Sequence, residues 1–277
     1  MHHDSVEHAF QQAVLKLPKE QRVFQAQKWG SIEQDSCLFG VPQTELFNWQ
    51  TLYQIPAHSN SFFFLMGADS VDLIEPFVRS HIPNQVQQLT IGTSTFPLSH
   101  SLDYRKIVSL LSQREWPNLK SLGLGLCMLF HNAGDAVGML GDITALLKAA
   151  PNLEQLWVSG YFELTQPVSL PHLTQLNIEV ISALGVGPKA LTQNSVDQLF
   201  NSNFPSLEEA YIDVSFPDML SEYKLPEHFT NAEHWRSLSR LEVVGLFTKG
   251  THAKLNASWS ALHPTGKFFF DEVQELD

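Results

Sequence analysis

The stretch Leu119-Lys120-Ser121-Leu122-Gly123-Leu124 carries the strongest fold signal in the chain. Its apolar residues stand at the first, fourth and sixth positions. The same pattern begins again at five other residues, which are Val86, Leu153, Leu173, Leu207 and Leu238. Successive starts are separated by 33, 34, 20, 34 and 31 residues. Repetition at a nearly constant period indicates stacked repeats, in which each unit packs against its neighbours.

Segments with helical periodicity separate most of these patterns. Apolar residues recur every three or four positions within 73–78, 104–111, 136–147 and 196–200. Residues 159–171 are too short for a helix and contain Pro167 and Pro171. We therefore expect parallel strands joined by helical crossovers, with an irregular loop in that one connection. Because helices are bulkier than strands, the stack should curve, with the sheet on its concave face and the helices on its convex face.

The ends of the array should be closed by capping strands, since terminal repeats have no outer neighbour. Ser61–Met66 is the expected first strand and Lys267–Phe270 the expected last one. Residues 1–57 do not repeat, and apolar residues from Val6 to Leu17 predict one amphipathic helix there. We predict a non-repeat N-terminal cap region at 1–57. A solenoid at 58–277 should follow, with about six recognisable repeats plus the terminal capping strands.

The repeated pattern with its following helix resembles the leucine-rich-repeat superfamily, in the style of the long repeats of ribonuclease-inhibitor-like horseshoes. The resemblance covers about residues 60–277 and implies an α/β fold, a curved leucine-rich-repeat solenoid. The family's Asn or Cys at the ninth position is kept only by Cys127. The other units have Ser94, Tyr161, Ile181, Ser215 and Leu246 there. The repeats are therefore degenerate, and most turns should lack the asparagine ladder.

Charge and composition exclude several classes of partner. The formal net charge of −12 and the pI near 5.4 argue against nucleic acid and anionic membranes, both of which need a cationic surface. An acidic chain favours basic partners instead. Cys37 and Cys127 are too few for a disulfide framework or a zinc site. No secretory signal or membrane-spanning stretch is visible, so we expect a cytoplasmic protein.

The outward-facing positions of the predicted strands point to a binding surface. Side chains alternate between the two faces of a strand, so the third, fifth and seventh positions of each pattern should face outward. These positions are small and neutral in the first two units. The later units carry aromatic, amide and acidic groups, and the candidate partner-binding residues are Trp157, Asn177, Glu179, Glu209, Tyr211, Asp213 and Glu242.

Adjacent strands lie about 4.8 Å apart, so Trp157, Asn177 and Tyr211 should form a row roughly 10 Å long. Aromatic residues on a rigid sheet with a rim of charge have the composition of a protein-binding hot spot. The alternative is that Trp157 and Tyr211 pack locally without a partner. The carboxylates would then be an ordinary solvated face.

Motifs that carry catalytic chemistry are missing from the sequence. It has no Gly-x-Ser-x-Gly elbow and no His-Glu-x-x-His pair, and Gly185–Lys189 lacks the spacing of a phosphate-binding loop. We therefore expect no catalytic residues, no cofactor and no metal. The expected function is a non-catalytic binding module with a protein partner. The alternative is an enzyme or enzyme accessory with its site in the non-repeat residues 1–57.

Overall fold

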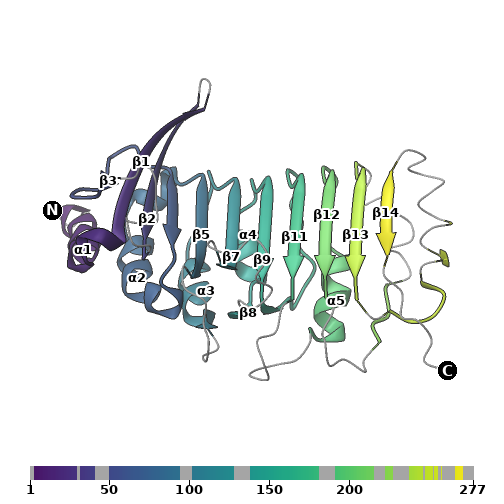
Figure 1. Cartoon of the computed structure of the whole chain (residues 1–277). Helices are drawn as coiled ribbons and strands as arrows, with labels where there is room; N and C mark the ends of the chain where they lie inside the picture. Colours follow the sequence, from purple (N-terminus) through teal and green to yellow (C-terminus); the bar gives the residue numbers. More distant parts are fainter. Residues whose placement is uncertain are drawn as a thin grey trace.

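The computed structural model describes residues 3–29, 32–40, 50–93, 102–127, 138–180, 191–214, 222–226, 237–245, 247–251, 253–254, 257 and 266–270. Within these residues, one large sheet runs the length of the molecule (Figure 1). The strands of this main sheet are β1 (Arg22–Trp29), β2 (Ile32–Phe39), β3 (Gln50–Thr51), β4 (Ser61–Phe64), β5 (Gln88–Thr93), β7 (Ser121–Cys127), β9 (Gln155–Ser159), β11 (Gln175–Glu179), β12 (Glu209–Asp213), β13 (Arg240–Val244) and β14 (Lys267–Phe270).

The main sheet has the order β14-β13-β12-β11-β9-β7-β5-β4-β2-β1-β3. Every neighbouring pair from β2 to β14 is parallel, whereas β1 pairs antiparallel with β2 and with β3. The predicted parallel order from β4 to β14 is confirmed, with β14 as the last strand. The expectation that β4 is the first strand is wrong, because β2 pairs in parallel with its other edge and β1 and β3 follow. Figure 1 shows the parallel strands added one after another in chain order.

The apolar positions of the repeated pattern form the core, as predicted. Leu122, Leu156, Leu176 and Leu241, at the fourth position of four units, are 0%, 3%, 2% and 1% exposed. These residues are stacked in register wherever their strands are neighbours; Leu156, for example, lies beside Leu122 on one side and Leu176 on the other. Burying a leucine side chain contributes about 1.5–3 kcal/mol, so this column is a main source of stability.

Helices occupy four of the described crossovers. They are α2 (Val71–Arg79) between β4 and β5, α3 (Arg105–Leu111) between β5 and β7, α4 (Thr144–Ala149) between β7 and β9, and α5 (Gln193–Phe200) between β11 and β12. The connection from β9 to β11 has no helix, which confirms that prediction. The connection does contain a short strand, β10 (Tyr161–Glu163), which the sequence did not reveal.

The prediction of one helix over residues 136–147 is wrong. Residues 138–142 form strand β8 (Gly138–Asp142), and helix α4 starts only at Thr144; residues 136–137 lie outside the described part. β8 pairs in parallel with β10 and with β6 (Leu102–Asp103) in a second, three-stranded sheet. Gly141 has a φ of +68°, which a helix does not allow. The Asp142 carboxylate accepts a hydrogen bond from the Thr144 backbone N–H at 2.9 Å, just before α4, whose N-cap is Ile143.

The N-terminal residues extend both the sheet and the core. β2 pairs in parallel with β4, and helix α1 (His3–Lys16) packs against α2. Phe10 of α1 is fully buried, and its ring centroid lies 5.2 Å from that of Phe77 and 6.4 Å from that of Phe64. The apolar core therefore continues without interruption from the repeats into α1.

A ladder of side-chain hydrogen bonds links successive units where the chain enters each strand. In each bond, the donor is the side chain of the residue immediately before a repeated pattern. The acceptor is a backbone carbonyl of the preceding unit, two positions before that unit's own pattern. The bonds are Asn118 to Asn84 (2.6 Å), Asn152 to Pro117 (2.7 Å), Ser206 to Pro171 (2.7 Å) and Ser237 to Pro205 (3.0 Å). The ninth-position residue Cys127 ends β7, and its side chain lies outside the described part.

Candidate binding face

Strands β9, β11, β12 and β13 bring the predicted site residues together in register. Trp157 lies beside Asn177, Asn177 beside Tyr211, and Tyr211 beside Glu242, so these four form one row across the sheet. The predicted row of Trp157, Asn177 and Tyr211 is confirmed. Two further rows flank it: Gln155, Gln175, Glu209 and Arg240 at the strand starts, and Ser159, Glu179, Asp213 and Val244 at the strand ends.

The middle of this face is hollowed. A depression of about 360 Å³ lies over β11 and β12. Five of the seven predicted residues line it, namely Trp157, Asn177, Glu179, Glu209 and Tyr211. Asp213 and Glu242 do not line it, although each is a direct register neighbour of a lining residue.

Sequence reasoning passed over two polar residues of the hollow. Gln175 and Arg240 stand at the third position of their patterns, and both are exposed and line it. The alternation of side chains along each strand already placed both residues on the outward face. They were not chosen as candidate binding residues because the choice favoured aromatic and acidic groups. Gln175 accepts a hydrogen bond from the Gln155 amide at 3.1 Å, and Arg240 lies 3.3 Å from the Glu242 carboxylate.

The exposure of the row alternates as the pattern requires. Partial exposure is shared by Trp157, Asn177, Tyr211 and Glu242. The residues immediately before and after each of them in the same strand are buried. The two aromatic side chains are therefore half-buried walls of the hollow. They offer apolar surface to solvent at its edges.

A β-bulge closes the face on the β7 side. The pairing of β5 with β7 shifts register between Ile91 and Gly92, and Gly125 at the bulge has a φ of +73°. After the bulge, a methyl group of Leu126 lies only 2.7 Å from the point where a Cβ on Gly123 would stand. Thr90, next to Gly123, is 4% exposed. Thr90 and Gly123 are therefore covered, and in this row the open face begins at Trp157.

Acidic groups dominate the electrostatics of the hollow. Burial raises the pKa of Glu179, and the neighbouring Asp213 carboxylate raises it further. Burial likewise raises the pKa of Tyr211 to about 12, with further contributions from Asp213, Glu179 and Glu242. Tyr211 is therefore neutral at physiological pH, and its hydroxyl donates to Asp213 at 3.5 Å. The burial contribution opposes a charge of either sign on these groups, whereas the contribution of the neighbouring carboxylates opposes negative charge alone.

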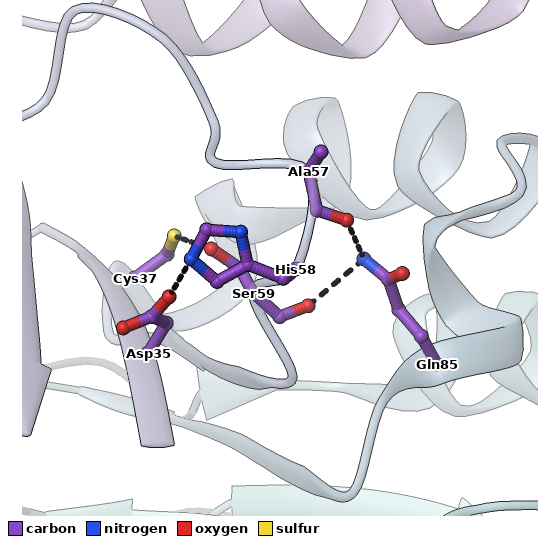
Figure 2. Close-up of polar contacts among 6 residues, drawn as sticks. All are labelled: Asp35, Cys37, Ala57, His58, Ser59 and Gln85. Carbon is purple, nitrogen blue, oxygen red and sulfur yellow. Dashed lines mark hydrogen bonds and ion pairs between the residues drawn. The ribbon is translucent and has the colours of Figure 1, made fainter. Parts of the chain in front are cut away.

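A separate polar cluster joins β2 to the loop before β4 (Figure 2). His58 forms an ion pair with Asp35, and the Cys37 thiol donates to the Ser59 hydroxyl at 3.4 Å. The Gln85 amide donates to the carbonyls of Ala57 and Ser59 at 2.9 and 3.0 Å.

This cluster combines residue types that serve in catalysis, but its cysteine is buried. The imidazole of His58 is paired with Asp35, and the Cys37 thiol is paired with the Ser59 hydroxyl (Figure 2). Cys37 is fully buried, and desolvation raises the pKa of its thiol to about 12. A nucleophilic cysteine needs an accessible thiolate, so these contacts instead hold the loop against the sheet.

The described part of the chain contains neither a metal-binding cluster nor a membrane-spanning helix. No group of three or more His, Cys, Asp or Glu side chains there is placed to hold a metal ion. Among its helices, none combines the length and the apolar character needed to cross a membrane. No protein-family model, curated protein or solved structure matches the chain in comparisons with known proteins.

Proposed function

We propose that the chain is a leucine-rich-repeat solenoid that acts as a non-catalytic binding module. Its main sheet would form the concave face, and the surface of β9 to β13 would receive a protein partner with a basic contact region. The observation that carries the proposal is the row of Trp157, Asn177 and Tyr211, held in register over a hollow lined by carboxylates.

The physical support comes from rigidity and composition. The row stands on hydrogen-bonded strands whose opposite face is the buried leucine column, so little ordering of the backbone is needed on binding. Pre-organised surfaces lose less conformational entropy when they bind. Trp and Tyr are the residues most enriched among energetic hot spots, because each buries a large area with few rotatable bonds.

Charge supports the basic character of the partner. The face carries Glu179, Glu209, Asp213 and Glu242, and the chain as a whole has a formal net charge of −12. Complementary charge accelerates encounter and rejects acidic competitors. We propose the cytoplasm as the compartment, where two cysteines would remain reduced.

The test is affinity capture under native conditions with the wild-type chain and with a Trp157→Ala/Tyr211→Ala double variant, followed by measurement of the affinity for the captured partner. Each single substitution should weaken binding by about 2 kcal/mol or more without an appreciable change in melting temperature. Tyr53→Ala is the matched control, because Tyr53 is 65% exposed and lies outside this face. A partner that binds the double variant as tightly as the wild type would place the binding surface elsewhere.

Charge reversal provides an independent check on the same surface. Glu209→Lys should chiefly slow association, because an exposed rim charge steers encounter more than it holds the complex. The effect should shrink as salt is raised from about 0.05 to 0.5 M. An effect confined to the dissociation rate would contradict the rim position of Glu209.

A further inference from the structure

The hollow has the dimensions and the chemistry of a site for one cationic side chain. Its walls are Trp157 on β9 and Tyr211 on β12, and Asn177 on β11 lies between them in the same row. Two strand spacings separate the backbones of the two aromatic residues by about 10 Å. A planar group stacked between two rings needs about 3.5–4 Å on each side. Rotation of the two side chains toward each other would close the difference of about 2–3 Å.

Two carboxylates stand side by side at one end of this slot. Glu179 and Asp213 are direct register neighbours at the strand ends, so their Cβ atoms lie roughly 5 Å apart. Both side chains are only partly exposed. Two carboxylates held side by side repel each other, and a shared cation would relieve that repulsion. The other end of the slot carries the amide of Gln175, the carboxylate of Glu209 and the guanidinium of Arg240, which is paired with Glu242.

We propose, as a refinement that rests on the function proposed above, that the slot over Asn177 receives one arginine side chain of the protein partner. Its guanidinium lies between Trp157 and Tyr211 and points its donors at Glu179 and Asp213. Charge complementarity selects a cation. The combination of aromatic walls and paired carboxylates selects arginine over lysine.

The preference follows from the different shapes of the two cations. A guanidinium is flat, weakly hydrated and forked, so it can stack on aromatic faces and donate to two carboxylates at once. An ammonium is a compact, strongly hydrated point charge that does not stack. Asn177 lies between the two aromatic residues in the same row, and its amide oxygen can accept from an N–H at the edge of the guanidinium.

The probes are capped hexaarginine and capped hexalysine peptides, which carry the same charge, titrated into the full chain by calorimetry at about 0.15 M salt. The wild-type protein should bind hexaarginine about 10-fold more tightly than hexalysine. Trp157→Ala and Tyr211→Ala should each reduce that preference to near unity. Tyr211→Phe, which keeps the ring, should retain it.

The contribution of the carboxylates is tested with a matched pair of charge removals. Glu179→Gln should weaken hexaarginine binding about 5-fold. Glu154→Gln should not, because the Glu154 carboxylate lies outside the slot and pairs with Lys120 at 2.8 Å. Equal losses in the two variants would mean that only net charge matters, and they would overturn the slot.

Failure of the refinement and failure of the proposed function give different results. Equal affinity of the wild-type protein for the two peptides, with all variants retaining the wild-type melting temperature, would overturn the arginine assignment. The proposed function would then still be judged by whether partner binding depends on Trp157 and Tyr211. A partner indifferent to both aromatic residues would overturn the proposed function, whatever the peptides do.

Discussion

Replacing Gly125 with alanine should destabilise the protein by about 2–5 kcal/mol. Gly125 has a φ of +73° at the bulge of β7, a conformation that costs an L-residue roughly 1–2 kcal/mol. In addition, a Cβ there would stand 1.9 Å from the carbonyl oxygen of Ser159 on β9. That oxygen belongs to backbone that cannot rotate away, so the two strands must separate. Such overpacking costs about 1–3 kcal/mol more.

Gly250→Ala isolates the conformational part of this cost. Gly250 has a φ of +82°, close to that of Gly125, but an added Cβ would meet no atom within 4 Å. Its replacement should therefore cost only about 1–2 kcal/mol. The assay is urea unfolding followed by circular dichroism, with both variants compared at equal protein concentration.

The difference between the two variants measures the close approach of β7 to β9. If the losses in unfolding free energy of Gly125→Ala and Gly250→Ala agree within about 0.5 kcal/mol, the added Cβ of Gly125→Ala has no steric cost. The bulge would then not be held against Ser159. The interpretation that Leu126 covers the sheet at Gly123 depends on that bulge, so it would be refuted as well.

Three other outcomes follow from the geometry. Leu176→Ala should cost about 2–5 kcal/mol in urea unfolding, because the side chain is 2% exposed; a loss below about 1 kcal/mol would contradict the register. Asn152→Ala should cost about 1 kcal/mol, since it leaves the Pro117 carbonyl without that 2.7 Å bond; an unchanged unfolding midpoint would show that water replaces it. Glu179→Gln should gain stability relative to the wild type as pH rises from 4 to 7. The raised pKa means that protonated Glu179 stabilises the fold below its ordinary pKa of 4.5, and this contribution is lost as pH rises through the folded-state pKa. A pH-independent difference between the two proteins would refute the shift.

The strands of the repeats and their outward faces were predictable from the sequence. Side-chain alternation in a strand follows from backbone geometry alone, so a residue such as Trp157 is assigned to a face once its strand is located. The equal spacing of apolar residues located the strands. The chain-order stacking of similar units then placed Trp157, Asn177 and Tyr211 in one row, as the pairing of β9, β11 and β12 confirms.

The error over residues 136–147 shows where local periodicity fails. Met139 and Leu140 satisfy a helical pattern together with Ile143 and Leu146, yet they lie in β8. Pairing with β6 and β10 contributes hydrogen bonds from segments more than 20 residues away, and no local window contains them. Gly138 and Gly141 were the available warning, because two glycines weaken any helix.

The sequence by itself determines the positions of the strands and the composition of the face. Both follow from the alternation of apolar and polar residues, which involves only near neighbours along the chain. The limits of the open face and the perturbed acidity of Glu179 belong to the tertiary structure. The bulge at Gly125 turns Leu126 over Gly123, and the pairing of β11 with β12 places Asp213 beside Glu179. The Glu179–Asp213 pair joins residues 34 positions apart in the sequence, and folding alone brings them together.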